Sequence, residues 1–558
     1  MSRHTATALV LALALPAAAQ DTLRDIQTAY VANKTRKVAR AYHFGSQGPN
    51  STFSNHASHT NRLIPVYTFG RKVDLASVTG KNSVYRDEAR LRDLYGFAPT
   101  NTLNPTAEYC DQSDLYKVQK DAADRGAKYI ITVWFDGMDW EATRAAAIAR
   151  TGKVYVEGKG TGLLFQDYDA AGSSQYGFYV TSPTHDKNNP NVDDQTVVIP
   201  ADNTPGGYDV QIAGPFPWGG GSLDASGYLK GQNANAEDRK GVEKVGRVLH
   251  AYTDSAPSAA EYASGVKSYN NSINFDESGR PVPTIFQQLQ GRGWRVGTAT
   301  SVAFDHASPA AMYAHDVNRD DYQDLAREML GLPGIVATTG KGPRLPGLDV
   351  VIGAGYSAAP IDAARARTQG RNEALNENLY ITDADLKAIN VDNGGNYVVA
   401  VRKPDARGPK QLADAAARAA AGRKRLFGFY GSGGGHLPYR TADGDYKPSP
   451  GFRGNRETYS REDLEENPTL ADMARAALTV LSAEPGKPFA LFVEAGDVDF
   501  ALHDNNLDNA VGAIYSGEDA VRAVFEWVEK HSNWDEAVVI VTADHGHYLV
   551  LDDPAALK

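Results

Sequence analysis

The sequence FALFVEAGDVDFALH occupies residues 489–503, where an apolar run gives way to acidic and histidine side chains. A second stretch of the same design, AVVIVTADHGH, occupies residues 537–547. Apolar, β-branched runs of this length, with a helical pattern between them, predict buried parallel strands. The polar side chains that follow the two runs are Glu494, Asp499, His503, Asp544, His545 and His547.

Parallel strands would place these side chains at one edge of a sheet, because ligands bind outside the carboxyl ends of such strands. A single Asp-His pair after a strand is more often a helix cap or a loop residue. Two such segments with six candidate ligands instead favour a site for several metal ions, since clustered Asp, Glu and His side chains bind zinc and magnesium.

Further apolar runs predict five more strands, and helical apolar spacing predicts helices between them. The strands are expected at residues 129–135, 295–300, 348–352, 397–401 and 426–429, and helices at 140–150, 410–423, 469–483 and 516–531. This pattern predicts an α/β fold with a central, mostly parallel sheet flanked by helices.

The chain of 558 residues is expected to have three parts. Residues 1–19 combine Arg3 and His4 with an apolar stretch and an A-x-A cleavage site, which predicts a secretory signal peptide. Residues 20–126 are polar and turn-rich and are interpreted as an N-terminal extension of unknown role. Residues 127–558 are expected to form the main domain, interrupted at about 165–235 by a large irregular insertion that is a candidate lid.

A net charge of −11 argues against nucleic acid or an acidic membrane surface as the main partner. An anionic substrate would therefore need local positive charge, which bound metal ions supply. No run after the signal peptide reaches membrane-spanning length, so the mature protein is expected to be soluble and either periplasmic or secreted. The single cysteine, Cys110, excludes an internal disulfide and is interpreted as a buried structural thiol.

Three further segments can be interpreted either as functional sites or as ordinary local structure. Asp136 follows an expected strand and precedes a glycine, so it is either a metal ligand or a helix N-cap. Ser255 stands at an expected helix start, where a serine is either a cap or a hydroxyl aimed, with any phosphate on it, at free N–H groups. The glycine run before His436 is only a weak phosphate-loop pattern, because no helix clearly follows it.

Several segments, taken in order, resemble the alkaline phosphatase family. They are DGM at residues 136–138, TDSA at 253–256, HASPA at 306–310 with Arg319 downstream, VE at 493–494 with Asp499 and His503, and TADHGH at 542–547. Any one of these motifs is weak evidence, whereas all of them together are specific. The resemblance covers roughly residues 127–160 and 240–550.

This resemblance implies an exported alkaline phosphatase that hydrolyses small phosphate monoesters through a phosphoserine at Ser255, with zinc and magnesium as cofactors. The implied ligands are Asp136, Ser255, Asp544 and His545 for one zinc, Asp499 and His503 for the other, and Asp136, His306, Ser308 and Glu494 for magnesium. Arg319 would grip two phosphate oxygens, which its planar fork does better than lysine. The resemblance also allows a homodimer, and no nucleic acid is expected as a structural partner.

The second zinc has one ligand fewer than the family supplies. In the family a third histidine comes from a segment well after the Asp-His-x-His motif, and here eleven residues follow His547. Either His436, whose glycine-rich loop could fold over the metals, or His547 itself is expected to complete this site. His436 is the favoured candidate at this point.

Other functions remain open from the sequence. A phosphodiesterase of the same superfamily usually carries a threonine nucleophile and has no counterpart of Arg319. A sulfatase needs a C/S-x-P-x-R context, which residues 255–259 do not provide. A non-catalytic exported binding protein would have no need of a nucleophile such as Ser255. A metal-dependent phosphomonoesterase is therefore the leading hypothesis.

Overall fold

The computed structural model describes most of the chain after residue 63, together with two short N-terminal pieces. The described ranges are 22–33, 59–60, 64–208, 210, 250–251, 253–362, 370, 373–451, 456–504, 506–547, 549, 551 and 553–558. The expected signal peptide lies outside these ranges, as does the last part of the expected insertion. No helix within them is long and apolar enough to cross a membrane.

Ten strands of the described chain form one large sheet, and most neighbours in it are parallel. The pairings from β10 through to β13 are parallel, whereas β2 is antiparallel to both of its neighbours. In spatial order the strands are β10 (Tyr397–Val401), β11 (Arg425–Phe429), β9 (Val350–Ala354), β8 (Arg295–Ala303), β12 (Phe489–Ala495), β4 (Tyr129–Phe135), β13 (Ala537–Thr542), β2 (Ile64–Phe69), β5 (Gln175–Val180) and β3 (Cys110–Asp111). The predicted α/β fold with a mostly parallel central sheet is confirmed.

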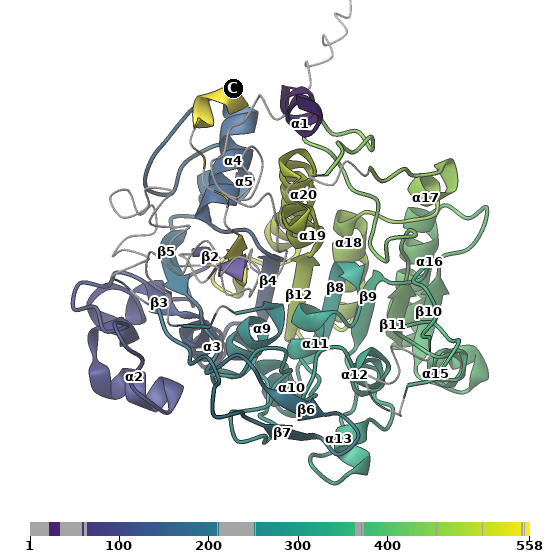
Figure 1. Cartoon of the computed structure of the whole chain (residues 1–558). Coiled ribbons are helices and arrows are strands. Elements are labelled where there is room, and N and C mark those ends of the chain that lie inside the picture. Colours follow the sequence, from purple (N-terminus) through teal and green to yellow (C-terminus); the bar gives the residue numbers. More distant parts are fainter. Residues whose placement is uncertain are drawn as a thin grey trace, which may run out of the picture.

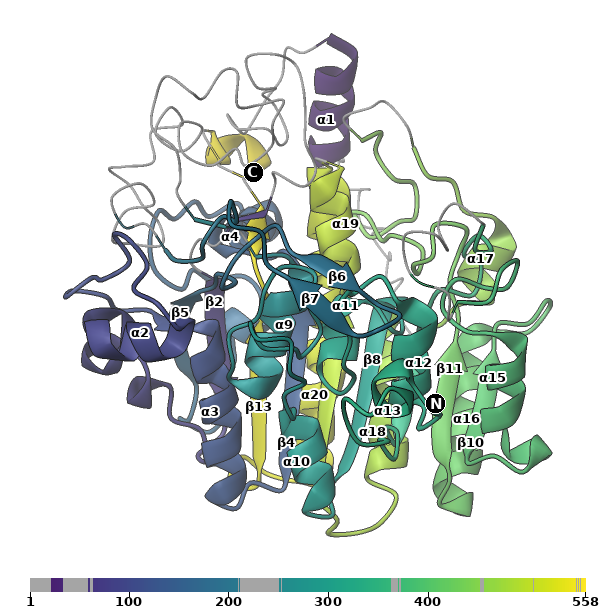
Figure 2. The same cartoon turned by 60° about the horizontal axis from the view of Figure 1, so that its bottom comes forward.

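Helices cover both faces of this sheet (Figures 1 and 2). One face carries α4 (Trp140–Thr151), α16 (Gly408–Gly422), α18 (Leu470–Leu481) and α20 (Leu507–His531). The other carries α3 (Gln112–Asp124), α9 (Ser255–Ser264), α10 (Ile285–Gly291), α11 (Ala307–Ala311) and α12 (Tyr322–Met329). Because both faces are covered, the central strands β4, β12 and β13 are buried along their whole length, which explains their continuous apolar runs.

Shorter elements surround this core. They are α1 (Thr22–Asn33), β1 (His59–Thr60), α2 (Glu88–Tyr95), α5 (Leu164–Asp167), β6 (Asn189–Asn191), β7 (Thr196–Val198), α13 (Ile335–Thr338), α15 (Asp383–Ile389), α17 (Arg461–Glu465), α19 (Asp497–His503) and β14 (Gly546–His547). The helix expected to start at residue 516 begins earlier, at Leu507, because the side chain of Asn506 caps it by accepting from Asn509 N–H.

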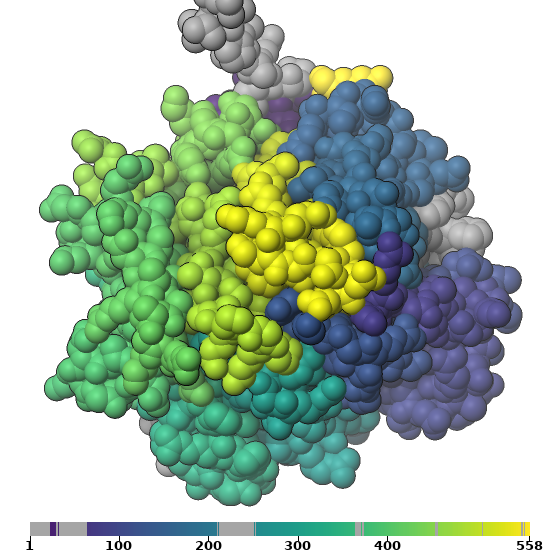
Figure 3. All heavy atoms as spheres, turned by 180° about the vertical axis from the view of Figure 1, so that it is seen from behind, coloured from purple at the N-terminus to yellow at the C-terminus, as the bar shows by residue number. Residues whose placement is uncertain are grey.

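The segment interpreted as an N-terminal extension contributes strands to the main sheet, so the fold is continuous across the expected boundary at residue 127. β2 lies beside β13, with Tyr67 opposite Val541, and β3 pairs with β5. In the view from behind, a small purple patch from early in the chain lies beside the yellow C-terminal region (Figure 3). The predicted burial of Cys110 is confirmed, because this residue of β3 is completely buried.

The expected insertion at about 165–235 is also more regular than its composition indicates. Its residues Gln175–Val180 form β5, a strand of the main sheet, and residues 189–198 form the β6–β7 hairpin. The glycine and tyrosine residues of this segment hide the strand, because they break the apolar pattern by which buried strands are predicted.

Candidate active site

Three neighbouring strands in the middle of the sheet end at one edge and carry acidic residues there. β12 and β13 flank β4, and their register places Glu494 and Thr542 on either side of Trp134. Asp136 and Asp544 follow two residues after Trp134 and Thr542. All three acidic side chains are completely buried. The parallel register thus brings together the acids that the sequence placed at the ends of separate strands.

Asp136, Asp544 and His545 form one group that could hold a metal ion. Nε2 of His545 lies 3.5 Å from Oδ1 of Asp136 and 3.4 Å from Oδ2 of Asp544. Burial, reinforced by the carboxylates of Asp544 and Asp499, raises the pKa of Asp136 well above its usual value. Oδ2 of Asp544 is buried and accepts no hydrogen bond. Crowded acids with an unused oxygen fit a divalent cation, which would stabilise their charged forms.

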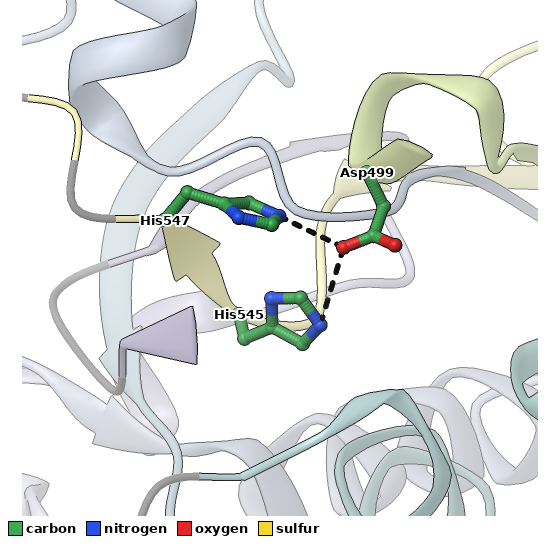
Figure 4. A group of neighbouring side chains, drawn as sticks. All are labelled: Asp499, His545 and His547. Carbon is green, nitrogen blue, oxygen red and sulfur yellow. Dashed lines mark hydrogen bonds and ion pairs between the residues drawn. The ribbon is translucent and has the colours of Figure 1, made fainter. Parts of the chain in front are cut away.

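Asp499, His545 and His547 form a second group, shown in Figure 4. Oδ1 of Asp499 lies 2.8 Å from Nε2 of His547 and 3.8 Å from Nε2 of His545. The same oxygen is 3.3 Å from Nε2 of His503, one turn further along α19. Burial lowers the pKa of His547 to about 3, so its ring is neutral and can offer a nitrogen to a metal.

Asp136, His306 and Glu494 form the third group. Thr300, in β8, donates a 2.5 Å hydrogen bond to Oε2 of Glu494, while Oε1 of Glu494 and Oγ of Ser308 are buried without a partner of normal geometry. Burial lowers the pKa of His306 to about 3. The Glu494 carboxylate oxygen and the Ser308 hydroxyl oxygen, together with the buried carboxylate of Asp136, match the oxygen ligands that magnesium prefers. Sequence reasoning missed Thr300, for which the only signal was a hydroxyl near the end of a predicted strand.

Ser255 opens α9 and lies against the first group. Its Oγ is 3.3 Å from Oδ2 of Asp136 and 3.3 Å from Nε2 of His545. The helix cap is supplied by the preceding residue, Asp254, whose side chain accepts from Ala256 N–H. Ser255 is therefore free of the capping role, and its hydroxyl stands at the positive end of the helix.

The far end of α9 is fixed by a buried ion-pair network. Nζ of Lys267 donates to Glu261 in α9 over 2.9 Å and to Asp111 over 2.8 Å. Asp111 in turn caps α3, the helix packed beside α9. These ion pairs connect the helix that begins at Ser255 to β3 and α3. The position of the Ser255 hydroxyl is therefore supported by contacts at the opposite end of its helix.

Arg319 lies between the segment of Ser255 and the third group. Its guanidinium is 3.6 Å from Oδ2 of Asp254 and 3.1 Å from Nε2 of His306. The backbone N–H of Arg319 donates to the carbonyl of Asn271, in the loop after α9. The sequence predicted Arg319 as a phosphate ligand, and the structure places it next to the candidate nucleophile and metal groups. Its contact with Asp254 was not foreseen.

The structure does not bring His436 to these groups. Its Nδ1 lies 2.7 Å from the Leu437 carbonyl, its Nε2 lies 3.1 Å from Glu457, and its ring stacks on Tyr439. It belongs to none of the acid and histidine groups formed by the described residues. The loop of His436 does reach this end of the sheet, because Leu437 N–H donates to the carbonyl of Ser301 in β8 and the His436 ring packs on Phe500 of α19. Both ring nitrogens, however, lie against the Leu437 carbonyl and Glu457 rather than against the acids of the site. Of the two candidates for the third ligand, His547 is the one beside Asp499.

Comparison with known proteins decides the family. The family model for alkaline phosphatase matches residues 228–554, which is more than half of the chain. The chain belongs to the alkaline phosphatase family. The matched residues include the candidate site residues from Ser255 to His547. In this alkaline phosphatase family member, Asp136 and the β6–β7 hairpin precede residue 228, where the match begins.

Individual relatives are distant. Alkaline phosphatase of Escherichia coli (strain K12) is 28% identical over 308 residues, covering 53% of this chain and 58% of that protein. Streptomycin-6-phosphate phosphatase of Streptomyces griseus is 26% identical over 337 residues, covering 58% of this chain and 69% of that protein. A solved alkaline phosphatase of Thermus thermophilus has a TM-score of 0.42 at 19% identity, covering 76% of this chain and 60% of that one. This alkaline phosphatase family member thus spans 58% of the E. coli protein's length.

Proposed function

We propose that the protein is an exported alkaline phosphatase that hydrolyses small phosphate monoesters through a phosphoserine at Ser255. The observation that carries the proposal is the position of the Ser255 hydroxyl, within 3.4 Å of Asp136 and His545 at the start of a helix. The guanidinium of Arg319 lies 3.6 Å from the carboxylate of the preceding residue, Asp254. A binding protein without catalysis would need no such arrangement around a serine hydroxyl.

We assign two zinc ions and one magnesium ion to the three groups. The proposed ligands are Asp136, Ser255, Asp544 and His545 for the first zinc, Asp499, His503 and His547 for the second, and Asp136, Ser308 and Glu494 for magnesium, with His306 nearby. When bound, such cations lower the pKa of a coordinated hydroxyl and neutralise charge on the phosphoryl group. His547 replaces His436 here, because, of these two histidines, it is His547 whose ring contacts Asp499.

The residues of the chain then have separate tasks. Oγ of Ser255 forms a bond to phosphorus while the ester oxygen leaves in line with it, and the alcohol takes up the proton that Ser255 gives up. Arg319 holds two phosphoryl oxygens with its planar fork. The positive end of the α9 dipole faces the same negative charge. Water then cleaves the bond between Ser255 and phosphorus, which releases inorganic phosphate.

The test compares the purified full-length protein on an aryl phosphate and on the corresponding diester. We expect monoester hydrolysis, loss of activity in a chelator, and recovery with zinc and magnesium. A clear preference for the diester would favour a phosphodiesterase, and absence of any hydrolysis by the metal-loaded protein would favour a binding protein. Export is tested separately by sequencing the N-terminus of protein recovered outside the cytoplasm, where cleavage after residue 19 is expected.

A further inference from the structure

The β6–β7 hairpin lies close to the segment that carries Arg319. Its two strands pair antiparallel, and both views place it near α11 and α9 (Figures 1 and 2). Val192, between the strands, joins a small buried cluster with Tyr269, Phe275, Val317 and Val336. The hairpin is therefore anchored by apolar packing to the loop after α9 and to the residues just before Arg319.

Gln195, at the turn of this hairpin, reaches inward from an unusual backbone conformation. Its φ is +48°, in the left-handed region that few non-glycine residues adopt, and its side chain is completely buried. The amide nitrogen donates to the carbonyl of Val192 and to Oδ2 of Asp316, each over 2.9 Å. The amide oxygen accepts from Val317 N–H over 3.2 Å. Both the nitrogen and the oxygen of this buried amide are hydrogen-bonded, so the Gln195 side chain makes specific polar contacts and does not only fill space.

The segment that Gln195 holds is fixed from its other side by the loop after α9. Asp316 and Ile273 exchange two backbone hydrogen bonds, over 2.9 Å and 3.0 Å. Oδ1 of Asp316 accepts from Asn318 N–H, and Arg319 N–H donates to the Asn271 carbonyl over 2.7 Å. Residues 316–319 are thus clamped between Gln195 and the loop of Asn271, and the guanidinium of Arg319 extends from this clamp.

We propose that Gln195 is a positioning residue for Arg319, acting through Asp316 and Val317 to set how tightly the site grips phosphate. This inference rests on the proposed function. Gln195 lies before residue 228, where the match to the family model begins. The hairpin therefore supports the segment of Arg319 from a part of the chain that the family model does not match. Gln195 touches no reacting atom, and its effect reaches the site only through the backbone of residues 316–319.

An amide side chain suits position 195 because it can donate to a carboxylate and accept from a backbone N–H at the same time. The Asp316 carboxylate lies within 4.8 Å of those of Asp321 and Asp324, all buried. A donor from Gln195 stabilises the charged form of Asp316 against these neighbours, while the amide oxygen pairs with a backbone N–H that would otherwise lack a partner. Loss of both contacts would let Asp316 and the residues after it shift, and the guanidinium would move with them.

The test replaces Gln195 by methionine, which keeps the length of the side chain and removes its three hydrogen bonds. Competitive inhibition of the full-length, metal-loaded enzyme by inorganic phosphate is measured, with kcat and KM for an aryl phosphate. We expect phosphate to inhibit Gln195→Met about 10-fold more weakly, as for the loss of a hydrogen bond to a charged group. Val198→Thr, at an exposed position of β7, is the matched control and should leave inhibition unchanged.

A double-mutant cycle separates positioning from general damage. In an Arg319→Ala background, Gln195→Met should change the inhibition constant less than 2-fold, because the group that it positions is gone. An equal loss in both backgrounds, or no loss in a folded Gln195→Met protein, would overturn the proposal. A variant with an altered circular dichroism spectrum would also count against positioning, in favour of a purely structural role.

A second variant and a second readout complete the design. Gln195→Glu keeps an acceptor for Val317 N–H but loses the donor to Asp316, and it should weaken phosphate inhibition at least as much as methionine does. Phosphate binding is also measured by calorimetry, which does not need turnover. A parent protein that binds phosphate but hydrolyses no monoester would contradict the proposed function alone, whereas unchanged binding in both Gln195 variants would contradict the positioning role alone.

Discussion

Nε2 of His547 lies 2.8 Å from Oδ1 of Asp499. The two residues come from α19 and from the short strand after β13, 48 positions apart in the chain. Burial raises the pKa of Asp499, but His503 and His547 together lower it well below the usual value for a carboxyl group. An ionised acid between two imidazoles is the arrangement expected of a zinc site with three protein ligands.

His547→Ala is expected to lose about one zinc per chain, because Asp499 and His503 alone would leave the second ion with two protein ligands. His436→Ala is the matched control and should keep the full zinc content, since His436 pairs with Glu457 instead. Elemental analysis of both dialysed variants measures the stoichiometry. Loss of zinc from His436→Ala with full content in His547→Ala would reverse the assignment.

Ser255→Ala should abolish phosphoserine formation and most turnover while leaving the fold and the metal content largely intact. The cap of α9 comes from Asp254, so removal of the Ser255 hydroxyl should barely affect the helix. Labelling with radioactive phosphate, followed by denaturation, detects the covalent intermediate. Ser264→Ala, at the other end of α9, is the control and should label like the parent. Undiminished labelling of Ser255→Ala would place the nucleophile elsewhere.

Arg319→Ala should weaken inhibition by phosphate and should lower kcat/KM. The corresponding loss of transition-state binding free energy should be a few kcal/mol at most, about the contribution of a charge-assisted hydrogen-bonded pair. Zinc content should be unchanged, because the Arg319 guanidinium contacts Asp254 and His306, neither of which is a proposed zinc ligand. Arg319→Lys should recover little of the loss, since lysine lacks the planar fork. Phosphate inhibition as strong as in the parent would show that Arg319 does not touch phosphate.

The metal-free protein should become less stable as pH rises from about 6.5 to about 8. Burial raises the pKa of Glu494 to about 8, although the hydrogen bond from Thr300 lowers it, whereas its usual value is 4.5. Folded Glu494 therefore keeps a proton that the unfolded chain releases, and stability is lost as pH approaches 8, by roughly 2 kcal/mol for one carboxyl over this range. His547 has the opposite effect, but only below its usual pKa of 6.5.

Urea unfolding of chelator-treated protein at pH 6.5 and pH 8 measures this dependence. Glu494→Gln, which cannot ionise, should flatten the change, and zinc with magnesium should oppose it by stabilising the charged acids. A midpoint that stays constant or rises between the two pH values would contradict the prediction.

The site was largely predictable because its residues follow strands that are buried on both faces. Such strands appear in sequence as unbroken apolar runs, and those of β4 and β13 match the expected ranges. β2 and β5 were missed, because each lies inside a segment whose composition is mostly polar. His436 was favoured over His547 because its glycine-rich loop could fold over the metals, but a local pattern does not show which partners a histidine ring finds in the fold, and here they are Glu457 and the Leu437 carbonyl. Gln195 could not be found at all, since one glutamine in a polar turn carries no periodic signal.

The position of β13 has a consequence for how the chain assembles. β13 is synthesised late but lies between β4 and β2, which are made early. At about 5–20 residues per second, roughly 20 to 80 s pass on the ribosome between the emergence of residue 135 and that of residue 537. Until then both older strands have an exposed edge, which invites pairing with other chains. Nascent chains stalled before residue 537 should therefore be sensitive to protease and prone to aggregate, whereas the finished chain should resist both.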